Sequence, residues 1–148
     1  MNVLSIVIII FIILETANIT ILYFSPGSKI GNGIGVFAAY EKSKADPEIH
    51  ALITYLINWV AGTKLIFIGL LLVIVVVGDE TTQLFAVIAL IPAILSFYWR
   101  LFPAIRKMDR AGLIKPRGYS RILGLMIGCF IGVFVIALAV YLLPEFLP

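Results

Sequence analysis

Two ionisable side chains interrupt long apolar stretches of the sequence and are the strongest candidates for chemistry. Glu15 lies in the apolar residues 3–24, and Lys64 lies in the stretch that ends at residue 77. A charged side chain at the centre of a bilayer costs about 2.5–3.5 kcal/mol on insertion scales, so each one needs a reason to be there. At about 1.5 Å per helical residue, Glu15 lies about 18 Å and Lys64 about 20 Å from the same membrane face. We therefore predict an ion pair, which protonation of Glu15 would break.

Lys64 has an alternative position that Glu15 lacks. Trp59 can mark the membrane surface, in which case the second span covers residues 60–77 and the long stem of Lys64 carries its ammonium to the headgroups. Glu15 has a shorter side chain and lies about nine residues from the end of its stretch. It must therefore be neutral, paired or exposed to a water-filled cavity. The sequence leaves open whether Lys64 pairs with Glu15 or extends to the headgroups, which is called snorkelling.

Three further polar side chains complete the candidate polar layer: Asn18, Asn58 and Ser96. Asn18 shares a helical face with Glu15 because the two are three residues apart. On the second span, a rotation of about 100° per residue places Asn58 on one stripe and Lys64 close to the opposite side. We therefore expect this helix to be central in the bundle, or to use one stripe for a second copy of the chain or for a partner protein. The stripe opposite Lys64 consists of Tyr55, Asn58, Gly62 and Gly69.

Helices must position these residues, and the composition indicates which kind. Of the 148 residues, 62% are hydrophobic and 13% are charged, against about 45–50% and about 25% in average globular proteins. With a mean hydropathy of +1.14, the composition excludes a soluble monomer, a disordered chain and a collagen-like chain. A bilayer core needs roughly 20 apolar residues per helix. The sequence predicts an all-α polytopic membrane protein, a single domain over residues 1–148 with a bundle of four transmembrane helices at about 3–24, 52–77, 84–102 and 122–143.

The positions of Lys and Arg predict the orientation of the chain. Most of them fall in the loops 25–51 and 103–121, whereas the only charged residues in the connection between the second and third spans are the acidic Asp79 and Glu80. Because short cytoplasmic loops collect positive charge, we predict that both basic loops are cytoplasmic and both termini lie outside. We interpret the charges of loop 103–121 first as topology signals, with binding of anionic lipid headgroups as the alternative. The headgroup candidates are Arg106, Lys107, Arg110, Lys115, Arg117 and Arg121.

The first loop contains three closely spaced glycines, Gly31, Gly33 and Gly35. Such spacing occurs in dinucleotide sites, but those need a strand before the glycines and a helix after them in a βαβ unit. No such unit is available here. We predict a flexible turn that leads into a short interfacial helix at about residues 36–44.

The third and fourth spans carry signals for helix packing. Pro92 is expected to kink the third helix, because proline lacks the N–H that would bond four residues back. On the fourth span, small residues at every fourth position allow close approach of another helix. These residues are Gly124, Gly128 and Gly132, with Cys129 beside them as a small core residue.

Little in the sequence indicates catalysis. The chain has one histidine, His50, and one cysteine, Cys129, so it offers no nucleophile with a positioned base and no metal-binding motif. We therefore expect neither an enzyme nor a cofactor or metal site. The sequence predicts instead a transporter or channel-type protein with Glu15 at its polar centre, working as a homo-oligomer among membrane lipids. The alternative is a non-transporting accessory or assembly subunit of a larger membrane complex, and no nucleic-acid partner is expected.

Overall fold

The computed structural model describes residues 2–146, and every regular element in that part of the chain is a helix. Four helical stretches are long and apolar enough to cross a membrane: Val3–Phe24, Pro47–Val77, Glu80–Arg110 and Tyr119–Leu143. The predicted fold class, an all-α bundle of four membrane-compatible helices, is therefore confirmed. The elements in chain order are α1 (Val3–Phe24), the 3-10 helix η1 (Ile34–Val36), α2 (Ala38–Ser43), α3 (Pro47–Val77), α4 (Glu80–Leu95), α5 (Phe97–Arg110) and α6 (Tyr119–Phe146).

Side-chain caps begin three of these helices. Asn2, Asp46 and Asp79 each accept a hydrogen bond from a backbone N–H in the following turn, at the starts of α1, α3 and α4. The first turn of a helix leaves such N–H groups without intrahelical partners, so each cap fixes a start. Pro47 follows its cap at the first helical position, where its missing N–H removes no helical bond.

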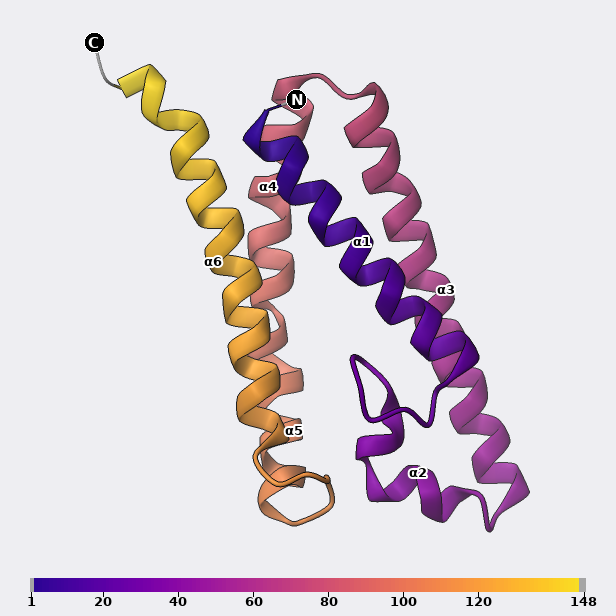
Figure 1. Ribbon diagram of the computed structural model, residues 1–148. Coiled ribbons are helices and arrows are strands. Elements are labelled where there is room, and N and C mark those ends of the chain that lie inside the picture. Colours follow the sequence, from indigo (N-terminus) through magenta and orange to yellow (C-terminus); the bar gives the residue numbers. More distant parts are fainter. Residues whose placement is uncertain (1, 147–148) are drawn as a thin grey trace.

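The helices form a bundle whose two ends differ (Figure 1). The start of α1, the end of α6 and the turn between α3 and α4 lie at what we call the terminal end. The segments 25–46 and 111–118 lie at the opposite end, the loop end. α1 packs mainly against α3, and α6 packs against α4, α1 and α5. Towards the loop end the α1 and α3 pair diverges from the α5 and α6 pair.

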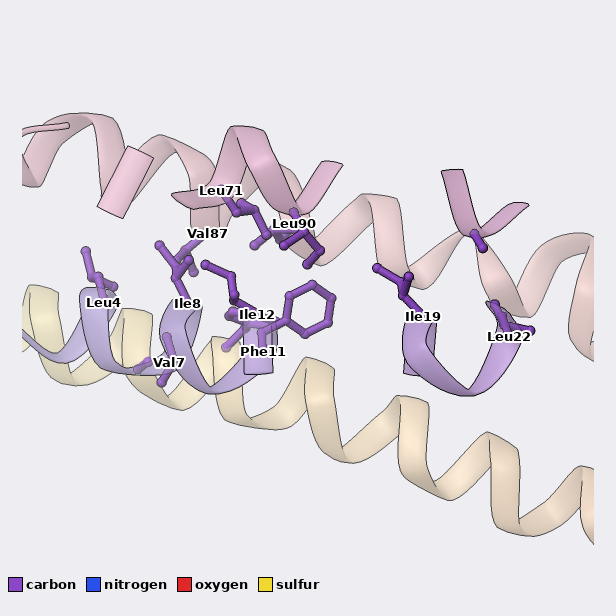
Figure 2. Close-up of a cluster of buried hydrophobic side chains, with 14 of the residues drawn as sticks. Leu4, Val7, Ile8, Phe11, Ile12, Ile19, Leu22, Leu71, Val87 and Leu90 are labelled. Atoms are coloured by element: carbon purple, nitrogen blue, oxygen red, sulfur yellow. The ribbon is translucent and has the colours of Figure 1, made fainter. Parts of the chain in front are cut away.

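The main hydrophobic core lies around the first half of α1, as Figure 2 shows. Leu4, Ile8 and Val87 are fully buried there, and Phe134 of α6 is 1% exposed. In a bilayer, lipid tails are as apolar as these side chains, so the core stabilises the bundle through close packing more than through removal of water. The terminal half of the molecule is thus a tightly packed unit of all four long helical stretches.

The third stretch is interrupted, and its position differs from the prediction. α4 runs through Pro92 and ends at Leu95, one turn later, and α5 begins after Ser96. The Ser96 hydroxyl donates to Ala93 O at 2.6 Å, and its carbonyl accepts from Trp99 N, three residues on. α5 then continues to Arg110, so residues 103–110 are helical where we expected a loop. α3 likewise starts at Pro47, before the predicted span.

The two basic loops join each other at the loop end. Phe37 and Ile114 form an antiparallel β-bridge, and Val36, Ile105 and Ile114 form a second small core beneath it. The short helix predicted near residues 36–44 is present as η1 and α2. The turn before it is closely packed instead of flexible, because a Cβ at Gly33 would clash with Ser28 O. Loops 25–46 and 111–118 therefore pack together as one folded unit at the loop end.

Candidate functional site

The Glu15 and Lys64 side chains meet between α1 and α3. Lys64 Nζ donates to Glu15 Oε2 at 2.5 Å, and the glutamate and lysine side chains are 14% and 27% exposed. Lys64 reaches α1 because it belongs to the stripe of α3 that faces it: the buried residues of α3 are Ile57, Ala61, Ile68 and Leu71, spaced three or four apart around position 64. Of the two positions that the sequence leaves open for Lys64, the structure contains the ion pair.

The ion pair lies at the wall of a cavity that is mostly apolar. The cavity has a volume of about 550 Å³ and lies between the α1 and α3 pair and the α5 and α6 pair. Glu15 and Lys64 are its charged wall residues, and Asn18 and Asn32 add amide groups. The rest of its wall is almost entirely apolar, with residues such as Ile57, Leu101, Ile105, Leu123 and Phe130.

An aromatic plug, which we define as Phe11, Phe67, Phe130 and Phe134, lies next to the ion pair on the side of the terminal end, and its Phe130 also lines the cavity. Phe11 contacts the other three rings edge to face, with centroid distances of 6.1, 5.7 and 5.4 Å. Phe11 is one turn from Glu15 on α1, and Phe67 is one turn from Lys64 on α3. The plug therefore lies directly beyond the ion pair, and the core of Figure 2 continues behind it.

Asn18 holds the first loop against the open side of the cavity. Its Oδ1 accepts a hydrogen bond from Asn32 N at 3.2 Å. Gly31 has a φ of +59°, and a Cβ there would lie 2.6 Å from the same oxygen. Glycine avoids both this clash and the strain that other residues meet at positive φ. Asn18 therefore has a positioning role, and its amide is held at the cavity wall.

Two predicted members of the polar layer do not reach the cavity. Asn58 is exposed on the outer side of α3, because six residues from Lys64 correspond to about 240° of rotation. Ser96 is also exposed, and its hydroxyl is bonded to its own helix. The structure therefore does not bring these two side chains to the cavity, because similar depth along a helix does not fix direction. Of the two alternatives for α3, the structure fits the one in which most of the stripe opposite Lys64 has no neighbour in the chain: a Cβ at Gly69 would meet nothing within 4 Å, whereas one at Gly62 would lie 3.5 Å from Tyr23 Oη.

The glycines of α6 contact α5 at two of their three positions. A Cβ on Gly124 would lie 2.7 Å from Phe102 Cε2, and one on Gly128 would lie 3.3 Å from Tyr98 Oη. The Tyr98 hydroxyl donates to Gly124 O at 2.5 Å. Gly132 has no such neighbour within 4 Å. Cys129 is exposed at an apolar groove between α1 and α6 and is not a core residue.

The six headgroup candidates separate into two groups. Four of them line a polar pocket of about 580 Å³ at the loop end, and Lys107 and Lys115 do not. The four are Arg106, Arg110, Arg117 and Arg121.

Two features of the bundle were absent from the sequence-based prediction. One is the aromatic plug, since nothing in the spacing of ten phenylalanines singles out those four. The other is a buried polar contact near the terminal end, where Ser5 Oγ donates to Gln83 Oε1 at 2.7 Å. Gln83 at the start of a span was a polar residue that could have been flagged as needing a buried partner.

Comparisons with protein-family models, with curated proteins and with solved structures find no match to this chain. Among the described residues, no group of three or more His, Cys, Asp or Glu side chains lies close enough to hold a metal ion. The arrangement offers instead an apolar cavity with one cation, one anion and two amides on its wall.

Proposed function

We propose that the chain is a small membrane transporter for a lipophilic ion, in which the cavity binds the solute and the Glu15–Lys64 pair is the polar switch. The observation that carries this proposal is a cavity that the pair lines, with the aromatic plug packed next to the pair. A site near the middle of the membrane that is open to one side and closed to the other is one state of an alternating-access cycle.

The cavity walls define the class of solute. A volume of about 550 Å³ lies in the range of pockets that hold drug-sized molecules, about 300–1,000 Å³. The apolar walls favour a solute with a lipophilic body. Either partner of the ion pair can offer its charge to a solute group of the opposite charge. Only a solute that is itself charged can replace one partner of the pair without leaving a buried charge alone.

We assign the carboxylate, not the ammonium, as the group that contacts the solute. Lys64 can leave the pair because its stem is long enough to snorkel, whereas Glu15 is held in place. A lipophilic cation would then take the position of the Lys64 ammonium. A proton on Glu15 removes the same negative charge, so proton and cation compete for one carboxylate. This competition couples cation movement to a proton gradient.

The test is flux through proteoliposomes that contain the full chain and carry an imposed pH gradient. Ethidium is the cationic probe, and a fluorescently labelled fatty acid is the anionic comparison. We expect ethidium flux that depends on the gradient, loss of that dependence in Glu15→Gln, and retention in Asn58→Leu, which removes a polar group outside the cavity. Parent flux equal to leakage from empty liposomes, or an unchanged pH dependence in Glu15→Gln, refutes the proposal. Flux of the fatty acid without flux of ethidium would show that Lys64, and not Glu15, contacts the solute.

A second candidate, an accessory subunit of a larger membrane complex, has its own supporting observation. The stripe of α3 that contains Tyr55, Asn58 and Gly69 faces away from the rest of this chain, and it places an amide among lipid-facing residues. A partner helix would give that amide a hydrogen bond. Gentle detergent extraction separates the candidates: a protein that co-purifies in fixed stoichiometry supports the subunit, and a stable homo-oligomer supports the transporter.

A further inference from the structure

A pocket at the loop end gathers four of the positive charges of the chain. Arg106 and Arg110 lie one turn apart near the end of α5, whereas Arg117 lies in the turn before α6 and Arg121 lies in the first turn of α6. All four line one polar pocket of about 580 Å³. Two helices and the turn between them therefore bring together guanidinium groups that are spread over sixteen positions of the sequence.

The carboxylate inside this pocket already accepts hydrogen bonds from the turn that precedes α6 and from the first turn of that helix. Asp109 Oδ1 accepts from Gly118 N at 3.0 Å, and Oδ2 accepts from Ser120 N at 2.9 Å and Ser120 Oγ at 2.6 Å. Asp109 thus fixes the turn that leads into α6. Within the described part of the chain, no arginine of the pocket forms an ion pair with a carboxylate within 4.0 Å. The pocket therefore holds an excess of positive charge that an anion would balance.

The guanidinium geometry and the depth of the pocket indicate which anion. Each guanidinium presents five N–H donors in a planar fork that matches phosphate oxygens two at a time. Trp99 on α5 is 75% exposed, as expected of a residue in the aromatic belt of a membrane surface. Arg106 lies seven residues further along the same helix, about 10 Å beyond that belt. Lipid headgroups begin at this belt and lie on the same side of it, where the long arginine side chains can extend back towards them.

We propose that this arginine pocket binds the phosphate group of an anionic ligand, and that at this depth the ligand is a lipid headgroup. The phosphate would lie between the ends of α5 and α6 and hold them together. Lys107 and Lys115 belong to the same segment of the chain but stay outside the pocket. They provide a matched control, because they carry equal charge in the same region.

The experiment measures lipid binding by the full chain in detergent, using native mass spectrometry. The probes are phosphatidylglycerol, phosphatidylcholine with the same acyl chains, and glycerol 3-phosphate as a soluble phosphate. We expect a preference for phosphatidylglycerol that falls about 30-fold in R110Q/R117Q, since each basic residue near an anionic headgroup contributes about a 5-fold factor. In K107Q/K115Q the preference should change less than about 3-fold, because those charges act only through the screened field of the surface.

The outcomes answer two separate questions: whether the pocket binds phosphate, and whether that phosphate belongs to a lipid or to a soluble molecule. Binding of glycerol 3-phosphate that R110Q/R117Q abolishes, without any lipid preference, supports the phosphate site and assigns it a soluble ligand. Equal losses in both double variants, or equal binding of both lipids by the parent, overturns the proposal. Should R110Q/R117Q fail to fold by size-exclusion chromatography, R110K/R117K replaces it. A several-fold loss there supports paired donors, since lysine lacks the fork, and no change overturns the site.

Discussion

The Glu15–Lys64 pair predicts an asymmetry between its two single variants. Lys64→Met leaves a carboxylate on a short side chain that is 14% exposed, and breaking a buried pair in this way costs about 3 kcal/mol. Glu15→Gln leaves an ammonium on a long stem that is 27% exposed, which can reach the headgroups, so the expected cost is about 1 kcal/mol. The double variant has no unpaired charge and should cost no more than Glu15→Gln alone.

The assay is reversible unfolding of the full chain in mixed micelles with increasing sodium dodecyl sulfate, followed by helical circular dichroism. The four proteins form a double-mutant cycle, and the expected coupling free energy is about 3 kcal/mol. Costs that add within about 0.5 kcal/mol would show that the two side chains act independently and refute the reasoning. Equal costs for the two single variants would refute the argument that Lys64 alone can snorkel.

The chain supplies a matched control pair for this cycle. Lys44 and Glu41 are also a lysine and a glutamate in contact, with Nζ and Oε2 2.9 Å apart, but their side chains are 50% and 61% exposed. Water and salt screen such a pair on both sides. We therefore expect additive effects for Glu41→Gln and Lys44→Met in the same assay. A coupling free energy as large as that of the buried pair would mean that the measured coupling does not depend on the burial of the two side chains.

Two further predictions concern packing and capping. Gly124→Ala places a Cβ 2.7 Å from Phe102 and should lower the free energy of unfolding by about 1–3 kcal/mol through overpacking. Gly132→Ala meets nothing within 4 Å and should leave the free energy of unfolding unchanged. The micelle assay measures both variants, and a larger loss for Gly132→Ala would contradict the prediction. The Thr82 hydroxyl and backbone N–H donate to Asp79 and lower the pKa of its carboxyl. The ionised cap therefore stabilises the fold above the ordinary pKa of an aspartate, and that stability is lost as pH falls through the lowered value. The thermal stability lost in Asp79→Ala should accordingly be full at neutral pH and should shrink in strong acid; a loss that stays constant with pH would argue against it.

Much of the fold could be predicted because its signals are local. α1 covers residues 3–24 as predicted, since its apolar run stops at a serine, a proline and a glycine. Helix ends that lie beyond the apolar runs were harder to place. Hydropathy marks the length that fits in lipid, but α3 and α5 continue past it as polar or amphipathic helix. The bounds of a span and the bounds of a helix are therefore different quantities.

The candidate site could be predicted only in part. Glu15 and Lys64 were identifiable because a charge in an apolar stretch is costly wherever it faces. Asn58 and Ser96 have similar depth but face elsewhere, and depth alone could not separate them from Asn18. The four pocket arginines could not be separated from Lys107 and Lys115 either, because all six lie in one short basic segment.

The amino-acid order by itself determined that four apolar helices form and which two charges are unusual, because each of these depends on residues within a short stretch of the chain. The rotation and crossing of the helices decided the rest: that Lys64 faces α1, that four phenyl rings meet beyond it and that four arginines share one pocket. Those contacts join residues far apart in the chain, and only the packing of whole helices against one another brings them within a few ångströms.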